Sequence, residues 1–150
     1  LDLSLRKSQK FDLILIKQKI HLLKLSEVKK LLKSLVKILN TKGKILIFTL
    51  DTTNNEIPTF KLMKFKLNKS LMRDKKILKI ITNLYPKRIK KKFIFKVKIS
   101  KKKYIEMIES RYISTLIPLS KKQLNQGIQE IKLSYKNQLK FKDKLNCIIL

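Results

Sequence analysis

The clearest pattern in the chain is a pair of short apolar runs separated by an amphipathic segment. Residues 11–16 read Phe-Asp-Leu-Ile-Leu-Ile, with no polar face after Asp12, and residues 45–50 form a second run of the same kind. Unbroken apolar runs of strand length are typical of parallel strands that are covered on both faces. The pattern therefore predicts two central, buried strands.

The segment between these runs predicts a helix. Ser26 is suited to the N-cap and Glu27 to the first turn, where the helix dipole favours an anion. From residue 28 to residue 39 apolar side chains recur at helical spacing, and lysines take the other face. Residues 40–43, Asn-Thr-Lys-Gly, predict that the helix ends in a left-handed turn. Strand, helix and strand in this order predict a β-α-β unit with parallel strands.

The pattern weakens in the middle of the chain. Residues 52–70 predict irregular structure with at most a faint helical stripe. A better helix follows over residues 77–84 and is stopped by Pro86. The basic run 87–92 predicts an exposed loop, and the alternation over residues 93–99 predicts a strand.

Two further helices and a strand complete the chain. The first helix carries Tyr104, and Ser120 caps the second, in which Gly127 costs about 1 kcal/mol relative to alanine. Residues 139–150 predict extended structure, with a final strand from Leu145. With no internal repeat and no linker, the order of elements indicates an α/β fold in one domain, or in the C-terminal part of one.

The charge of the chain raises the question of a polyanionic partner. The formal net charge is +28, and all but four of the 38 basic residues are lysines; the exceptions are Arg6, Arg73, Arg88 and Arg111. Arginine is favoured for bidentate contacts with phosphates and base edges. The lysine excess therefore favours surface solvation and compositional drift over a selected polyanion site, although a nucleic-acid partner at the basic surface stays open.

Several classes of site are disfavoured by composition. Cys147 is the only cysteine, so no intrachain disulfide can form and a reducing compartment suffices. No apolar run approaches the roughly 20 residues that span a bilayer, and the beginning of the chain does not resemble a signal peptide. One histidine and one cysteine cannot make a zinc site. We expect a cytoplasmic protein with no membrane partner and no bound metal.

The order of these motifs resembles a known family. The chain has a strand that opens with Phe11-Asp12, then His21, an amphipathic helix and the sequence Lys-Gly-Lys-Ile-Leu-Ile at 42–47. This order resembles the second half of a class I S-adenosylmethionine-dependent methyltransferase of the small-molecule type. Residues 111–130 resemble the helical insertion between the last strands of that family, and residues 141–149 its terminal strand. The resemblance implies a partial Rossmann-like sheet, made of a β-α-β unit and terminal strands with a helical insertion.

The cofactor-binding half of the family has no counterpart here. The chain has two glycines, Gly43 and Gly127, and neither belongs to a Gly-rich first loop; that loop and the acidic residue that binds the ribose would precede Leu1. The resemblance therefore implies that residues 1–150 are the C-terminal part of a methyltransferase-like domain whose N-terminal, cofactor-binding half is absent. We expect S-adenosylmethionine-dependent methyl transfer to an unidentified small molecule in a longer protein, with this chain alone inactive.

The resemblance also assigns cofactor contacts. Asp2 corresponds to the position that contacts adenine, and Ile16 and Lys17 fall where the chain passes the methionine part of S-adenosylmethionine. For Ile16 and Lys17 the expected contact is through the backbone. An exposed loop aspartate is the alternative interpretation of Asp2.

Four residues are candidates for binding the methyl acceptor. His21 and Asp51 follow strands at the edge where α/β sheets bind ligands. Arg111, one of few arginines, suits a bidentate clamp on a carboxylate or phosphate, and Tyr112 lies beside it. The alternatives are a histidine satisfied by backbone, an acidic loop residue, and an arginine that caps carbonyls or pairs with Glu109. No catalytic acid or base is assigned, because alignment of acceptor and methyl group carries much of the rate of such a reaction.

Two other functions fit the composition. A lysine-rich, RNA-associated structural protein of the ribosomal type would use the +28 charge for salt-dependent phosphate contacts. A pseudoenzyme subunit that supports a partner methyltransferase is the third possibility.

Overall fold

The computed structural model describes residues 9–150, which divide into two compact units. The described part of the first unit comprises residues 9–50, Asp74–Phe93 and Leu145–Leu150, and the second comprises Asp51–Arg73 and Ile94–Lys144. Each unit has its own hydrophobic core, and each is described by itself below.

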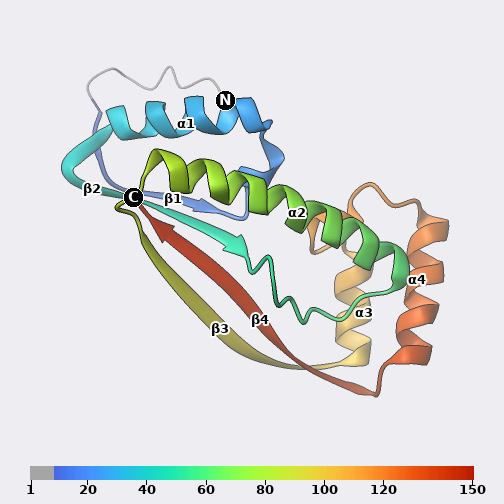
Figure 1. Ribbon diagram of the computed structural model, residues 1–150. Helices are drawn as coiled ribbons and strands as arrows, with labels where there is room; N and C mark the ends of the chain where they lie inside the picture. Colours follow the sequence, from blue (N-terminus) through green and yellow to red (C-terminus); the bar gives the residue numbers. More distant parts are fainter. Residues whose placement is uncertain (1–8) are drawn as a thin grey trace. The chain divides into compact units, whose positions relative to one another are not determined.

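A four-stranded mixed sheet gives the chain its α/β fold (Figure 1). The strand order is β1-β2-β4-β3; β1 and β2 run parallel, and β4 runs antiparallel to β2. The described strands are β1 (Phe11–Lys17), β2 (Leu39–Leu50), β3 (Ile89–Ser100) and β4 (Gln138–Ile149). The parallel pairing of β1 with β2 confirms the predicted β-α-β unit.

Four α-helices and two short 3-10 turns connect the strands within the described residues. The helices are α1 (Leu25–Lys37), α2 (Lys61–Leu84), α3 (Lys101–Glu109) and α4 (Lys121–Ser134). The turns are η1 (Ile20–Leu22), which follows β1, and η2 (Ser114–Leu116), which lies between α3 and α4. The helical insertion between the last two strands is thus α3, η2 and α4.

The first unit has a core on one face of its sheet. Alternate residues of β2, Ile45 and Ile47, are fully buried, and they pack with Ile148 of β4 and with apolar side chains of α1 and α2. The other face is open at β1, where Leu13 is 56% and Leu15 57% exposed. The prediction of a central strand covered on both faces is therefore wrong for β1, which lies at one end of the described sheet.

The predicted left-handed turn after the first helix is also wrong. α1 ends at Lys37, the chain enters β2 at Leu39, and Gly43 lies inside this strand with no positive φ angle. Glycine is needed there for space, because a Cβ atom at Gly43 would lie 2.7 Å from the carbonyl oxygen of Phe11. The close approach coincides with an irregularity in the register between β1 and β2 at Phe11.

The first turn of α1 begins earlier than predicted. Lys24, not Ser26, is the N-cap residue, and Ser26 lies inside the helix. The predicted contribution of Glu27 holds in a different form: its Oε2 accepts a hydrogen bond of 2.8 Å from the backbone N–H of Lys24. This contact satisfies a donor at the helix end, where an anion also interacts favourably with the helix dipole.

Two long elements replace structure that the sequence pattern left irregular. α2 is one continuous helix of 24 residues, so the predicted irregular segment over 61–70 is helical. The basic run expected to be a loop belongs in part to β3, which begins at Ile89, and β4 is a single strand that starts at Gln138. Met63, near the beginning of α2, is buried in the core of the second unit, whereas Ile77, near its end, is buried in the core of the first unit. Each half of α2 therefore has its own apolar stripe.

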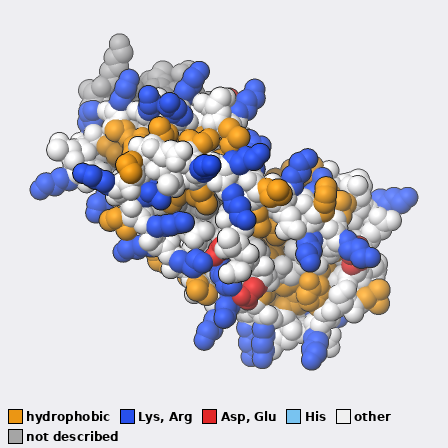
Figure 2. All heavy atoms as spheres, viewed as in Figure 1, with side chains coloured by type: hydrophobic (Ala, Val, Ile, Leu, Met, Phe, Trp, Pro, Cys, Tyr) orange, Lys and Arg blue, Asp and Glu red, His pale blue; other side chains and the backbone are white. Residues whose placement is uncertain are grey.

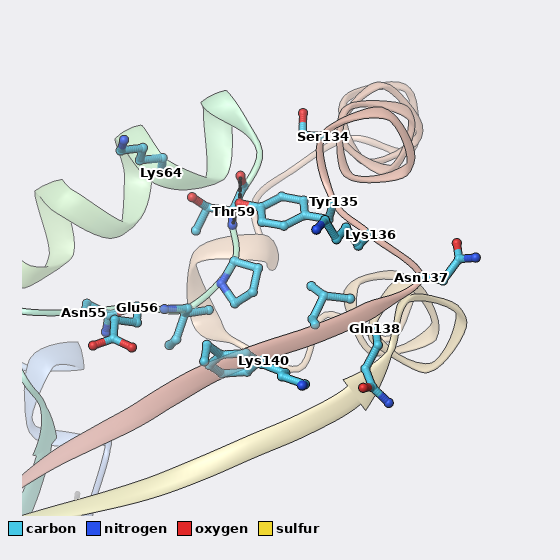
Figure 3. A pocket seen from close by; sticks show the side chains of 14 residues that line it. Asn55, Glu56, Thr59, Lys64, Ser134, Tyr135, Lys136, Asn137, Gln138 and Lys140 are labelled. Carbon is cyan, nitrogen blue, oxygen red and sulfur yellow. Dashed lines mark hydrogen bonds between the residues drawn. The ribbon is translucent and has the colours of Figure 1, made fainter.

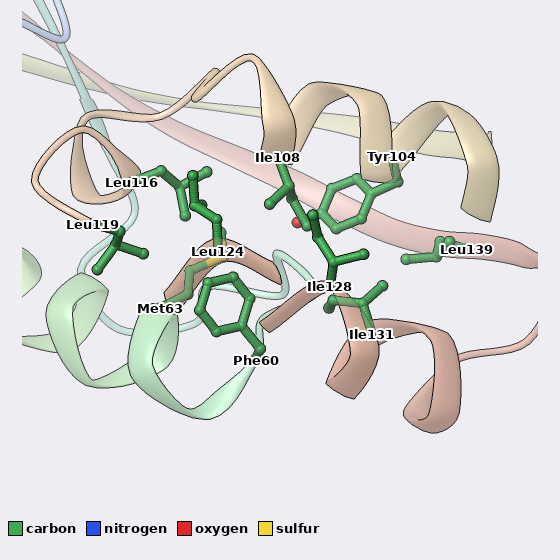
Figure 4. Packing of buried hydrophobic residues seen from close by; sticks show 10 residues of the cluster. All are labelled: Phe60, Met63, Tyr104, Ile108, Leu116, Leu119, Leu124, Ile128, Ile131 and Leu139. Atoms are coloured by element: carbon green, nitrogen blue, oxygen red, sulfur yellow. The ribbon is translucent and has the colours of Figure 1, made fainter. Parts of the chain in front are cut away.

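The second unit is packed around α3, α4 and the beginning of α2 (Figure 4). Tyr104 and Ile108 of α3 are fully buried against Ile131 of α4 and Met63 of α2. Ser120 caps α4 as predicted: its Oγ accepts from the N–H of Gln123 at 3.2 Å. The remaining buried members of this cluster are Phe60, Leu116, Leu119, Leu124, Ile128 and Leu139.

Gly127 of α4 permits the contact between this helix and Phe60. A Cβ atom at Gly127 would lie 2.5 Å from the nearest ring carbon of Phe60, and the ring is itself buried. The local helix propensity therefore gives way to tertiary packing at this position.

Substitution Gly127→Ala should destabilise the protein, in spite of the higher helix propensity of alanine. We expect the free energy of unfolding to fall by about 1–3 kcal/mol, because the added methyl overpacks the Phe60 ring. Urea unfolding followed by circular dichroism measures the change. Asn125→Ala, at an exposed position of the same helix, is the matched control and should leave stability equal or higher. A more stable Gly127→Ala variant would contradict the packing described.

Candidate functional site

The carboxyl end of β1 carries an unusual backbone turn. Gln18, which follows the last strand residue, has a φ of 50°, and its N–H donates a 2.9 Å hydrogen bond to the carbonyl of Phe48. Positive φ is uncommon for residues other than glycine and costs free energy, so such residues are frequent at functional sites. Ile16 packs against the core of the first unit and Lys17 is exposed. The two residues predicted to contact the cofactor thus point to opposite faces of β1.

His21 belongs to η1, in the loop that begins at Gln18. The side chain of the preceding Ile20 is buried in the core of the first unit and fixes the turn, whereas Leu22 is largely exposed. The N–H of Leu22 donates to the carbonyl of Lys19 at 3.0 Å. Lys17 and His21 are therefore brought into one short loop at the carboxyl end of a parallel strand, and His21 is half-buried there.

Asp51 begins the segment of the second unit that leads toward α2. Its side chain is only 2% exposed, and its Oδ1 accepts hydrogen bonds from the backbone N–H of Thr53 at 3.0 Å and from the Thr53 hydroxyl at 2.7 Å. Its own N–H donates to the carbonyl of Lys144 at 2.8 Å. Asp51 therefore fixes a turn at this point, as aspartate commonly does.

Arg111 holds together the loop between α3 and η2. Its Nη1 donates to the carbonyl oxygens of Leu116 at 2.5 Å and Ile117 at 2.8 Å, and its φ is 55°. This arrangement matches the carbonyl-capping alternative considered for Arg111. The left-handed backbone turns the chain sharply, so that Tyr112 points back toward α3.

Tyr112 joins a cluster of buried polar groups in the second unit. Its hydroxyl lies 2.9 Å from that of Tyr104, and the Tyr104 hydroxyl donates to the carbonyl of Pro58 at 2.5 Å. Phe141 packs edge-on against Tyr104 with ring centroids 6.3 Å apart. Asp143 is near enough for its charge to act on Tyr112, and its Oδ1 is buried without a hydrogen-bond partner among the described residues.

Both phenols of this cluster are neutral at pH 7, and burial raises their pKa values further. It raises the pKa of Tyr112 to about 12 and raises the pKa of Tyr104 further above its usual value. Tyr112 retains 38% exposure overall, but its hydroxyl end lies against the fully buried Tyr104. Burial also raises the pKa of the Asp143 carboxyl. The cluster therefore presents neutral hydroxyl groups that both donate and accept hydrogen bonds at neutral pH.

An open pocket of about 950 Å³ adjoins this cluster (Figure 3). It is formed by the segment from Asn55 to Thr59, by Lys64, and by residues 134–141 after α4. Pro58 and Phe141, which contact Tyr104, also line the pocket. A pocket of this size suits a small molecule.

Polar groups from separate segments stand along the pocket. The Tyr135 hydroxyl accepts from the N–H of Thr59 at 3.0 Å and donates to its carbonyl at 3.1 Å. Glu56 accepts from the Lys144 ammonium at 2.5 Å and from the N–H of Lys142 at 3.2 Å. The hydrogen bond from Lys144 lowers the pKa of Glu56, an exposed residue. Sequence reasoning missed Tyr104, Glu56 and Asp143, because their roles depend on segments far apart in the chain.

The surface is strongly basic. Figure 2 shows lysine and arginine side chains spread over the visible face, with few acidic side chains between them. No group of three or more potential metal ligands occurs among residues 9–150. Within the same described range, no helix combines the length and apolar character that a membrane crossing requires.

Asp2, the remaining predicted cofactor contact, lies outside the described residues. Comparison with known proteins adds no assignment, because no family model matches the chain and no curated protein matches it. There are thus two candidate sites, one in each unit: the residues from Lys17 to His21 in the first, and the tyrosine cluster with its pocket in the second.

Removal of the Arg111 side chain should loosen the loop of residues 111–117. We expect Arg111→Ala to lower the free energy of unfolding by about 1–3 kcal/mol, because two carbonyls lose a charged hydrogen-bond donor. Lys122→Ala, at an exposed position of α4, is the control and should change stability by less than about 0.5 kcal/mol. Unchanged urea unfolding of Arg111→Ala would show that the clamp does not stabilise the loop.

The tyrosine cluster predicts a loss of stability at alkaline pH. The pKa of Tyr112 is about 12 in the folded protein and about 10 in an unfolded chain, so folding favours the neutral phenol. The contribution of Tyr112 to the free energy of unfolding should be fully present below pH ~10 and should decrease as the pH rises toward 12. Tyr112→Phe should flatten this decline. Ultraviolet titration of the phenols provides the measurement, and a Tyr112 midpoint near pH 10 would refute the expectation.

Proposed function

We propose that this chain forms the acceptor-side part of a class I S-adenosylmethionine-dependent methyltransferase that acts on a small molecule and is active only within a longer protein. The observation that carries the proposal is the strand arrangement of the sheet. β4, the last strand, runs antiparallel to β2 and lies between β2 and β3.

This arrangement resembles the second half of the methyltransferase sheet. In that family the last strand is likewise antiparallel and inserted between the two strands that precede it. On this correspondence β1 and β2 take the places of the fourth and fifth strands, and α1 is the helix between them. The insertion of α3, η2 and α4 between β3 and β4 adds to the likeness, since the family carries helices at the same point.

The loop from Lys17 to His21 is the proposed cofactor contact. Ligands of open α/β sheets bind at the carboxyl ends of the parallel strands, and this loop leaves the carboxyl end of β1. The left-handed backbone at Gln18 directs the chain sharply away from the strand. In the proposal, backbone groups around Lys17 contact the methionine part of S-adenosylmethionine, and His21 lies on the acceptor side.

Within the second unit, the pocket is proposed to bind a polar small molecule. Its wall contains Pro58 and Phe141 and is backed by the Tyr104–Tyr112 pair, which stays neutral at physiological pH. Among the residues that line the pocket, Glu56 and Tyr135 carry polar groups that can orient a polar small molecule. This role is sufficient for methyl transfer, because the sulfonium methyl is already reactive and rate comes mainly from alignment.

Calorimetric titration of the full-length protein with S-adenosylmethionine tests the proposal. We expect saturable binding, and we expect Gln18→Pro to weaken it at least tenfold, because proline cannot adopt a φ of 50°. Asn125→Ala, at an exposed position of α4 outside the proposed sites, is the control and should leave affinity unchanged.

Two results would contradict the proposal. The first is the absence of S-adenosylmethionine binding by a full-length protein that circular dichroism shows to be folded. The second is binding that is unaffected by Gln18→Pro in a variant that remains folded, which would remove the loop after β1 from the cofactor site.

A further inference from the structure

The described residues of the first unit leave one face of its sheet uncovered, and this face is apolar. Residues paired across neighbouring strands share a face: Leu15 pairs with Leu46, which pairs with Ile149. Leu13 and Leu15 are more than half exposed, and Leu46 and Ile149 are half-buried. We call this surface, made of Leu13, Leu15, Leu46, Phe48, Phe93 and Ile149, the open face.

The opposite face of the same strands has a complete cover. Ile14, Ile45, Ile47 and Ile148 point to that side and pack with α1 and the second half of α2. The burial of β2 alternates accordingly, with buried residues on the helix side and half-buried residues on the open face. The helices of the first unit therefore cover one side only.

The aromatic residues show how the open face is partly shielded. The rings of Phe48 and Phe93 lie with centroids 5.9 Å apart, although their strands β2 and β3 are separated by β4. Phe48 is paired with Cys147 of β4, so the two rings meet over this small residue. Their cover explains why Cys147 is buried although no helix covers this side. The leucines of β1 have no such cover.

The sequence of these strands is that of a sheet covered on both sides. Residues 13–16 and 45–48 are unbroken apolar runs, whereas a strand with one face in water alternates apolar and polar residues. Parallel strands of this composition occur with helices on both faces. The open face thus has the apolar composition of a buried surface but is partly exposed to solvent. Exposed apolar surfaces of this kind are typical of interaction sites.

Charge decides which occupant fits. The open face also carries Lys17 and Lys44, which follow the same alternation as Leu15 and Leu46, and Lys91, whose charge acts on Cys147. No Asp or Glu lies at the open-face positions of these strands within the first unit. A second copy of this chain would bring another charge of +28 to the contact, so the charge opposes self-association.

We propose that the open face is a docking surface for a partner protein that contributes an acidic amphipathic helix. The leucine or isoleucine stripe of that helix packs on Leu13, Leu15 and Leu46, and its flanking carboxylates pair with Lys17, Lys44 and Lys91. The apolar residues of the open face lie outside the proposed cofactor and small-molecule sites, whereas Lys17 borders both the open face and the proposed cofactor contact.

A labelled synthetic peptide tests this surface directly. The probe has about 20 residues, with leucine on one helical stripe and glutamate on both flanks. Fluorescence anisotropy at about 0.15 M salt limits the contribution of distant lysines. We expect the unmodified protein to bind the peptide and the double variant L13N/L15N to bind it about tenfold more weakly, since two leucine contacts are lost. Both substituted residues are exposed, and circular dichroism confirms that the variant folds.

Matched controls separate the docking surface from non-specific attraction. Leu133→Asn removes the most exposed of the large apolar side chains of the described residues, on α4, and should leave binding unchanged. K44Q/K91Q should weaken binding and reduce its dependence on salt. A peptide of equal charge in which alanine replaces leucine should bind at least tenfold more weakly than the probe.

Three outcomes would overturn the proposal. Equal binding of the leucine and alanine peptides, or of the unmodified protein and L13N/L15N, would reduce the interaction to charge alone. A second contradicting result is that a uridine oligonucleotide binds through Leu13 and Leu15 while the peptide binds independently of them. The open face would then be a nucleic-acid binding surface. Sedimentation of the unmodified protein as a dimer and of L13N/L15N as a monomer would assign the face to a second copy.

Discussion

The antiparallel pairing of β4 with β2 is the constraint on which the rest of the first unit depends. It places Ile148 beside Ile47 on the face that α1 and α2 cover, and Cys147 beside Phe48 on the other face. All other described elements after β2 lie between β2 and β4 in the chain. Residues 145–150 of β4 therefore complete a core to which β1 also contributes. The same pairing defines the strand order that resembles a methyltransferase sheet.

The candidate sites of the two units follow from two different local causes. At Gln18 the chain leaves a parallel strand in a left-handed conformation, which places Lys17 and His21 in one loop. In the second unit, the left-handed turn at Arg111 sends Tyr112 back against Tyr104. Neither residue is a glycine, and both backbones are held by hydrogen bonds that the surrounding structure supplies.

The sequence predicts those features that depend on neighbours along the chain. The β-α-β unit and the helix cap at Ser120 both follow from local pattern. Tertiary contacts decide what the pattern misses. Glycine is required at position 43 because the carbonyl of Phe11 leaves no room for a Cβ atom. In α2, two apolar stripes pack in different cores, so the sequence pattern of this helix looks like two separate segments. The tyrosine cluster unites residues 58, 104, 112 and 143, and no spacing in the sequence signals that contact.

The register between β2 and β4 can be tested with the only cysteine of the protein. Ile45 and Leu150 exchange two backbone hydrogen bonds, so Phe48 and Cys147 form a non-hydrogen-bonded pair, whose side chains approach closely. Oxidation of a Phe48→Cys variant should therefore give an intramolecular disulfide, detected as a mass lower by two hydrogens. Ile47→Cys, on the opposite face, should stay reduced. A disulfide in Ile47→Cys and none in Phe48→Cys would contradict the sheet described.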